Sequence, residues 1–148
     1  MAAAAYQPTL ITLLIEAGAN IHAKNRHGDQ PIHSAAVGTP GSSNWNPSTQ
    51  SEAIVRLVNA GADPDSANKL GVTPLHRAVR TRCAAAVRTL LASGVNPARR
   101  NKSGSTAISL ATLNTGRGGT GSEEAKSQQQ EIIRMLEQYM RQAPDLPR

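Results

Sequence analysis

A short pattern recurs along this chain at regular spacing, and it constrains the fold more than any other feature. It consists of a glycine, two further residues and a segment that can start a helix, and it occurs at 28–36, 71–78 and 104–111. These glycines are separated by 43 and then by 33 residues. A second marker, glycine followed by Ala or Val and then Asn or Asp, has the same two spacings and starts at Gly18, Gly61 and Gly94. Two independent markers that share one period indicate a chain built from repeats.

Each repeat is predicted to contain a turn followed by two helices. Thr73 suits a helix cap because its side-chain oxygen can accept a free backbone N–H of the first turn. Pro74 suits the first helical position, where its missing N–H costs nothing, and Gly71 permits a tight turn. An apolar segment with the i, i+3, i+4 spacing of one helix face precedes each second marker. Its residues are Ile11, Leu14 and Ile15; Ile54, Leu57 and Val58; and Val87, Leu90 and Leu91.

At these residues the chain resembles the ankyrin repeat family, whose repeats have a period of about 33 residues and a Thr-Pro-Leu-His-x-Ala signature. The match is close at 73–78, looser at 30–35 and degenerate at 106–111. The resemblance extends from about residue 2 to 139. It implies an all-α repeat fold, an ankyrin-type solenoid of stacked helix-turn-helix units with short β-hairpin fingers.

We expect one ankyrin repeat domain over 1–143. Its parts are a partial repeat at about 2–23, a repeat at 24–66 with a loop insert at 38–50, a repeat at 67–99, a C-terminal capping repeat at 100–140 with a loop insert at 114–129, and a disordered tail at 144–148. The expected helices are 2–5 (a last turn), 9–17, 31–37, 52–60, 74–82, 84–93, 107–113 and 130–139. The chain thus opens inside a repeat, which favours a fragment of a longer array over a short native N-terminus and predicts an exposed apolar face near Ile11 and Leu14.

The sequence favours a non-catalytic protein of the cell interior. A single cysteine, Cys83, excludes an internal disulfide. We find no signal peptide, no membrane-spanning segment and no nucleophile paired with a base, so we predict no enzyme and no cofactor. The glycine-rich run at 116–121 lacks the ending of a phosphate loop, and His22, His27 and His33 lack ligand partners for a metal. We expect a cytoplasmic monomer, with the nucleus as the alternative in a eukaryote.

Several residues are expected to have structural roles. In the ankyrin family the signature histidine hydrogen-bonds to nearby backbone, which the resemblance implies for His33 and His76, whereas Ser109 replaces it in the last repeat. The full structural set is Thr73, Pro74, His33, His76, Gly28, Gly71 and Gly104. Trp45 has two interpretations: its ring folds back on the neighbouring helices, or it is an exposed anchor for a partner.

Charge placement gives the strongest functional signal. The net charge is +6, and nine basic residues but no acidic one lie between Asp65 and Glu123. In ankyrin arrays the finger tips and inner helices line the concave binding side, so the resemblance places many of these cations there, whereas Arg88 is expected on the outer side. The candidate partner-binding residues are Lys24, Arg26, His27, Lys69, Leu70, Val72, Arg77, Arg80, Thr81, Arg100, Lys102, Ser103, Ser105 and Leu113.

We therefore predict a protein–protein interaction scaffold that binds an acidic peptide or protein on its basic concave and finger face, because opposite charge raises on-rate and selectivity. Arg80 and Lys102 would contribute charge, and Leu70 and Leu113 apolar contact. Two other interpretations remain for the chain: a targeting or substrate-recruiting module of a larger enzyme, or cations that only keep the surface solvated. Nucleic-acid binding ranks lower, because the fingers have no aromatic residues on which bases could stack.

Overall fold

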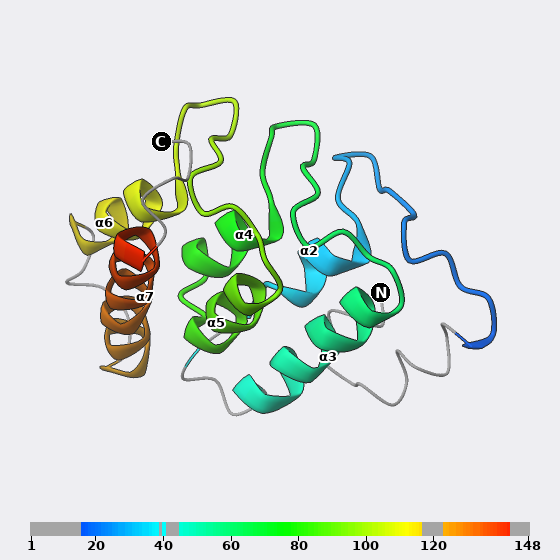
Figure 1. The fold of residues 1–148 in the computed structure, drawn as a ribbon, viewed down its shortest axis with the longest axis horizontal. Helices are drawn as coiled ribbons and strands as arrows, with labels where there is room; N and C mark the ends of the chain where they lie inside the picture. The colour runs from blue at the N-terminus through cyan, green and yellow to red at the C-terminus, as the bar shows by residue number, and fades with distance from the viewer. Residues whose placement is uncertain (1–15, 39, 41–44, 117–122, 143–148) are drawn as a thin grey trace.

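The computed structural model describes residues 16–38, 40, 45–116 and 123–142 and arranges them as paired helices (Figure 1). The helix turns expected at 2–5 and 9–15, the apolar face at Ile11 and Leu14, residues 117–121 of the glycine-rich run and the tail at 144–148 lie outside the described residues. The helices are α2 (Pro31–Ala35), α3 (Pro47–Asn59), α4 (Pro74–Arg80), α5 (Ala84–Ala92), α6 (Ala107–Gly116) and α7 (Glu123–Gln142).

The helices form two rows. The first row consists of α2, α4 and α6, and α4 packs against both of its neighbours in that row. The second row consists of α3, α5 and α7, with α5 packed against both α3 and α7. Each helix of one row also contacts its sequence partner in the other: α2 with α3, α4 with α5, and α6 with α7 (Figure 1). The described residues are therefore an all-helical repeat, as predicted.

Connecting loops project from the same side of the array before α2, α4 and α6 (Figure 1). They are the expected fingers, but the described part of the chain contains no β-strand. The predicted β-hairpins are therefore not confirmed, because these segments are held by turn hydrogen bonds and not by strand ladders.

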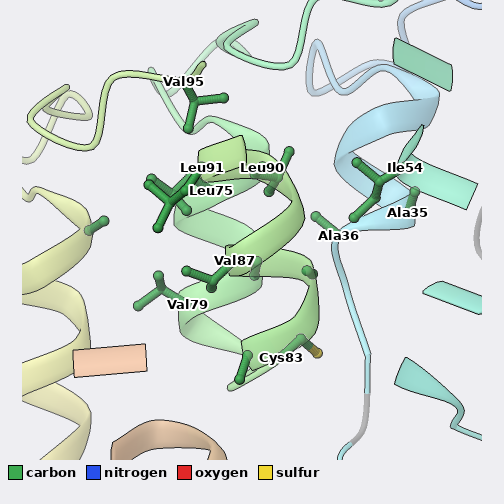
Figure 2. Packing of buried hydrophobic residues seen from close by; sticks show 14 of the residues in the cluster. Ala35, Ala36, Ile54, Leu75, Val79, Cys83, Val87, Leu90, Leu91 and Val95 are labelled. Carbon is green, nitrogen blue, oxygen red and sulfur yellow. The ribbon is translucent and has the colours of Figure 1, made fainter. Parts of the chain in front are cut away.

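The core lies between the two rows and is made of small and branched aliphatic side chains. Leu75 and Val79 of α4 meet Val87 and Leu90 of α5 there, and all four are at most 2% exposed (Figure 2). Small side chains occupy many of the remaining buried positions and allow helices to approach closely. The fully buried small residues are Ala35, Ala36, Ala53, Ala78 and Ala86.

The first α-helix of the middle repeat starts as its sequence predicts. The Thr73 hydroxyl accepts a hydrogen bond from the His76 N–H, and Pro74 takes the first helical position. In the preceding repeat α3 begins at Pro47, five residues before the expected start at 52. The Asn46 side chain caps it by accepting from the N–H groups of Ser48 and Thr49, at 2.9 and 3.2 Å. Residues 47–50 of the expected loop insert are therefore helical.

The closing helix α7 likewise begins at Glu123, whereas the sequence placed its start at 130. Glu123 and Glu124 lie in its first turn, where negative charge is favourable next to the free N–H groups and the helix dipole. One turn later the Gln128 side chain accepts a hydrogen bond from the Ala84 N–H at the start of α5. Residues 123–129 of the second expected insert thus form two helical turns that pack on the neighbouring pair.

Two buried glutamines explain why the early starts are stable. In the middle pair, the short turn after α4 brings the Cys83 N–H to 2.9 Å from the Ala78 carbonyl. In the other two pairs the equivalent carbonyls receive a side-chain donor. Gln50 Nε2 lies 3.2 Å from the Ala35 oxygen, and Gln129 Nε2 lies 2.9 Å from the Ala111 oxygen. A glutamine of the second helix therefore replaces a backbone donor where the connection is longer.

Trp45 completes this arrangement in the first described pair. Its indole N–H donates to Gln50 Oε1 at 3.1 Å, and its partly buried ring packs against the core. A side chain at Gly38 would lie within 2.6 Å of the indole nitrogen, so glycine is needed where the ring sits. The half-buried ring thus lies against the helices.

Replacing Gln129 by Met should lower the free energy of unfolding by about 1–3 kcal/mol, because it removes the amide that bonds the buried Ala111 carbonyl. The matched control is Gln130→Met, since Gln130 is the exposed neighbour on the same helix. Urea denaturation of both variants measures the difference. Equal stability of the two variants would show that the Gln129 hydrogen bond contributes nothing.

Candidate protein-binding surface

The loops before α2, α4 and α6 share a turn built around an asparagine. In the middle loop, Asn68 Oδ1 accepts from the N–H groups of Leu70 and Val72 at 2.9 and 3.0 Å. The Asn68 N–H in turn donates to the Val72 carbonyl, and the Gly71 N–H donates to the Asn68 carbonyl. Asn25 and Asn101 make the same four hydrogen bonds in the other two loops. The three loops therefore present equivalent residues in equivalent places.

The glycine of each turn has two reasons to be glycine. Gly28, Gly71 and Gly104 have φ of +81°, +73° and +81°, in the left-handed region that side chains disfavour. The first two also lie against the following loop. A Cβ on Gly28 would lie 2.9 Å from the Lys69 backbone nitrogen, and one on Gly71 would lie 3.0 Å from that of Lys102.

Backbone hydrogen bonds join each loop to the next across this close contact. The Lys69 N–H donates to the His27 carbonyl at 3.0 Å, and the Lys102 N–H donates to the Leu70 carbonyl at 2.9 Å. These bonds bring the turns of the three loops into register along one edge of the array. The lysines at positions 69 and 102 consequently occupy the same place in successive repeats.

The two signature histidines connect each helix start to the following loop. His33 Nδ1 accepts from the Gln30 N–H at 3.1 Å, so its proton lies on Nε2, which is 3.0 Å from the Val72 carbonyl. His76 Nδ1 accepts from the Thr73 N–H, and its Nε2 lies 3.2 Å from the Arg99 and Ser105 carbonyls. Both rings act as neutral bridges with one donor and one acceptor.

Ser109 stands in place of the histidine in the last repeat. Its hydroxyl accepts from the Thr106 N–H and donates to the Thr106 carbonyl, both at 2.9 Å. Within the described part of the chain, its bonds thus stay at its own helix start, whereas His33 and His76 also bond a carbonyl of the following loop.

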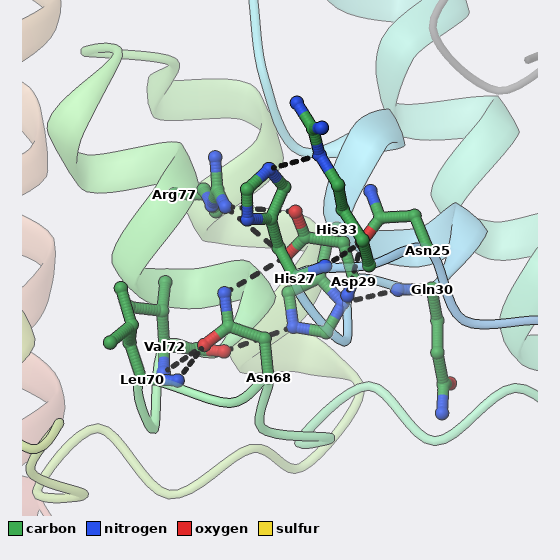
Figure 3. Close-up of polar contacts among 10 residues, drawn as sticks. Asn25, His27, Asp29, Gln30, His33, Asn68, Leu70, Val72 and Arg77 are labelled. Atoms are coloured by element: carbon green, nitrogen blue, oxygen red, sulfur yellow. Dashed lines mark hydrogen bonds and ion pairs between the residues drawn. The ribbon is translucent and has the colours of Figure 1, made fainter.

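A partly buried ionic cluster joins α4 to the first two loops (Figure 3). Arg77 NH2 contacts both carboxylate oxygens of Asp29, at 3.1 and 3.0 Å, and the Asn68 side-chain amide donates to the same carboxylate at 2.9 Å. Burial alone would raise the pKa of Asp29, but the Asn68 hydrogen bond and the Arg77 charge outweigh it and lower that pKa. Arg77 therefore connects α4 to the loop before α2.

The predicted binding residues divide into two groups by exposure. The half-buried residues have internal roles: Val72 accepts from His33, Arg77 pairs with Asp29, and the Thr81 hydroxyl donates to the Arg77 carbonyl. Ser105, also half-buried, donates its N–H to Asn101. The exposed residues are Lys24, Arg26, His27, Lys69, Leu70, Arg80, Arg100, Lys102, Ser103 and Leu113.

Ion pairing further separates the basic residues. Arg77 pairs with Asp29, Arg88 of α5 pairs with Glu131 of α7, and Arg99 lies 3.7 Å from Asp65. Within the described ranges, no ion pair is found for four exposed cations of the second and third loops and the end of α4, namely Lys69, Arg80, Arg100 and Lys102. We call these four residues the free basic set.

Sequence reasoning missed the loop asparagines and the role of Asp29. The signal for the asparagines was present, because Asn25, Asn68 and Asn101 each stand three residues before a repeat glycine. An asparagine that bonds its own backbone two residues on is typical of such turns. No comparable signal marked Asp29, since neither Val72 nor Ser105 at the equivalent positions is charged.

The geometry defines a class of protein built from stacked helical pairs with projecting loops. Residues 57–111 match the family model described as ankyrin repeats in many copies. A search of curated proteins found no match. Residues 57–111 are therefore similar to ankyrin repeats, and members of that family are generally protein-interaction modules and typically non-catalytic.

None of the helices in the described ranges has the length and apolar character needed to cross a membrane. Over the same ranges, no three residues of the His, Cys, Asp or Glu types come together in a way that could hold a metal ion.

Gly71→Ala should destabilise the protein more than Gly94→Ala. Both glycines have positive φ, but a Cβ at Gly94 meets no atom within 4 Å, whereas one at Gly71 meets Lys102 backbone at 3.0 Å. The shared backbone strain costs about 1–3 kcal/mol in each variant, so the excess measures the close contact between loops. Thermal and urea denaturation give that difference, and equal losses would contradict a tight contact.

Stability should fall as the pH drops below about 6.5, the usual histidine pKa. Burial is the main cause that lowers the pKa of His33 and of His76. Because the unfolded chain then binds protons that the folded one rejects, their contribution is complete above that pH and is lost on acidification. Unfolding free energies between pH 8 and 5 test this.

Proposed function

We propose that the chain binds an acidic peptide or protein across its loop tips and the exposed ends of the first-row helices. The observation that carries this proposal is the free basic set: its cations are exposed and without ion pairs in the described structure, although acidic residues pair with other arginines nearby. A partner with carboxylates would find charges that the fold itself leaves uncompensated. We further infer that the pairs form one ankyrin-type solenoid.

Two exposed leucines support a mixed apolar and charged interface. Leu70, at a loop tip, is 65% exposed, and Leu113, in α6, is 64% exposed. Leu113 occupies in α6 the place that Arg80 occupies in α4, 33 residues earlier. Burying a leucine side chain contributes about 1.5–3 kcal/mol, so the leucines would supply affinity while the cations supply selectivity and association rate.

The loop architecture supports a surface of fixed shape. Backbone bonds hold Lys69 and Lys102 in successive loops at equivalent positions, so their separation is set by the repeat and not by loop mobility. Less ordering entropy is then lost when a partner binds. Arg77 is left out of the proposed contacts, because its guanidinium already pairs with Asp29.

The double variant Arg80→Glu, Lys102→Glu should weaken binding of acidic peptides, selected from a random library, at least tenfold. The matched control is Arg134→Glu, Arg141→Glu, which changes the net charge equally but alters exposed residues of the outer helix α7. Binding is measured by fluorescence anisotropy at physiological salt, after circular dichroism shows that both variants are folded.

Three outcomes separate the interpretations of this experiment. Loss in the first variant alone supports the proposed surface. Equal loss in both would mean that net charge, and not this surface, attracts the peptides. No loss in either would overturn the assignment. Selection of no acidic peptide by the unmodified chain would also contradict the proposal.

A further inference from the structure

An open groove lies at the C-terminal end of the array, between the third loop, the start of α6 and the end of α7. Its volume of about 440 Å³ is large enough for several side chains of a bound molecule. The lining combines apolar residues, such as Ile108 and Met140, with three exposed charged ones: Arg100, Glu137 and Arg141. A groove of this kind suits a segment that carries both apolar and charged side chains.

The equivalent positions are covered inside the array. Leu75, the counterpart of Ile108 one repeat earlier, is 2% exposed, whereas Ile108 is only half-buried. Asp65 is the counterpart of Ala98 in the groove lining, and it accepts a hydrogen bond from the Asn96 N–H of the following loop. The groove is therefore the face on which each earlier repeat receives its successor, and it is open in the described structure.

The backbone of the third loop also lacks a contact that the two earlier loops make. The carbonyls of His27 and Leu70 accept hydrogen bonds from the following loop, donated by the N–H groups of Lys69 and Lys102. Ser103 holds the corresponding place in the third loop, and within the described residues no hydrogen bond to its carbonyl is found. An extended chain can use such a carbonyl, because it offers backbone N–H groups together with side chains for neighbouring pockets.

The charges of the groove favour an acidic chain. Arg100 belongs to the free basic set and also lines the groove, and its guanidinium donates to the Gly104 carbonyl at 2.8 Å, beside the turn of the third loop. On the opposite side, Glu137 and Arg141 lie one helical turn apart on α7, and their opposite charges offset each other. Arg100 is therefore the charge of this lining that a carboxylate of a partner would compensate.

We propose that the groove binds a bulky apolar side chain of an acidic partner, next to a carboxylate of the partner that contacts Arg100. The inference rests on the proposed function, because it takes the acidic partner from there and adds an apolar contact at the end of the array. The apolar side chain covers Ile108 and Met140, much as a successor repeat covers Leu75. The partner class is thereby narrowed to acidic segments in which a leucine, isoleucine or methionine stands beside the acidic residues.

A second apolar hollow, between α5 and α7, is less suited to this partner. Its volume is about 210 Å³, and its lining includes Leu91, Met135 and Tyr139. The cation of that lining, Arg88, already pairs with Glu131. A carboxylate of the partner therefore has less to gain there than at Arg100, and the second hollow provides a control site.

The acidic peptides selected on the unmodified full chain provide the probe. Each is made in two forms, one with its bulky apolar residue and one with serine in that place. Met140→Ser should weaken binding of the apolar form about fivefold, because it removes apolar lining, and should leave the serine form unchanged. The matched control is Met135→Ser, the same change on the same helix in the second hollow, which should bind both forms as the unmodified chain does. In the unmodified chain the apolar form should shift the Ile108 methyl signal in NMR spectra and leave that of the distant Ile54 unchanged.

The outcomes separate this inference from the proposed function. Binding that is lost in Arg80→Glu, Lys102→Glu but is equal in Met140→Ser and the unmodified chain would overturn the groove and leave the loop surface standing. Binding that depends on Met140 alone would support the groove and contradict the loop surface. Selected peptides without a bulky apolar residue would overturn the groove, and the absence of any bound peptide contradicts both. An Ile108 signal that shifts with protein concentration alone would identify a second copy as the occupant, against the repulsion expected between two chains of net charge +6, and the proposed occupant would be wrong.

Discussion

The close backbone contact between successive loops is the constraint on which the rest of this structure depends. The Lys69 and Lys102 amides reach carbonyls of the preceding loop only because Gly28 and Gly71 have no Cβ in the way. An asparagine holds the loop that presents those carbonyls. The same loop also needs this glycine because its φ is positive there. One residue type therefore serves both the internal shape of a loop and its contact with the next, which keeps the exposed side chains in register.

The need of every buried carbonyl for a hydrogen-bond donor explains how the repeats vary in length without losing this geometry. A buried carbonyl without a donor costs about 1–3 kcal/mol, so lengthening the connection after α2 or α6 must be offset by a new donor. Gln50 and Gln129 provide it from the same place in their repeats. His33 and His76 provide further donors at the helix starts, where each bonds a carbonyl of the following loop.

How much of the fold can be predicted from the sequence depends on how local each signal is. Thr73, Pro74 and the apolar spacing of α5 act within a few residues, so the sequence predicts both helices of the middle repeat. The starts of α3 and α7 were missed because Asn46 and Pro47 also fit a loop, and because glutamine-rich residues before 130 show no apolar face of their own. Gln129 is buried for a partner 18 residues away, a contact that no local pattern indicates.

The candidate surface was harder to predict, because basic residues in one run have different roles once folded. Arg77 and Arg80 are three residues apart on α4, yet one pairs with the buried Asp29 of an earlier loop while the other is exposed. Their difference depends on which residue lies 48 positions earlier, and the charge pattern alone does not contain it. Replacing a cation that forms an internal ion pair, such as Arg77, would lower the stability of the fold. Lys69, Arg80 and Lys102 form no such pair in the described structure and can change with little cost to folding. Under the proposed function, the second group can therefore vary with the partner independently of the array that supports it.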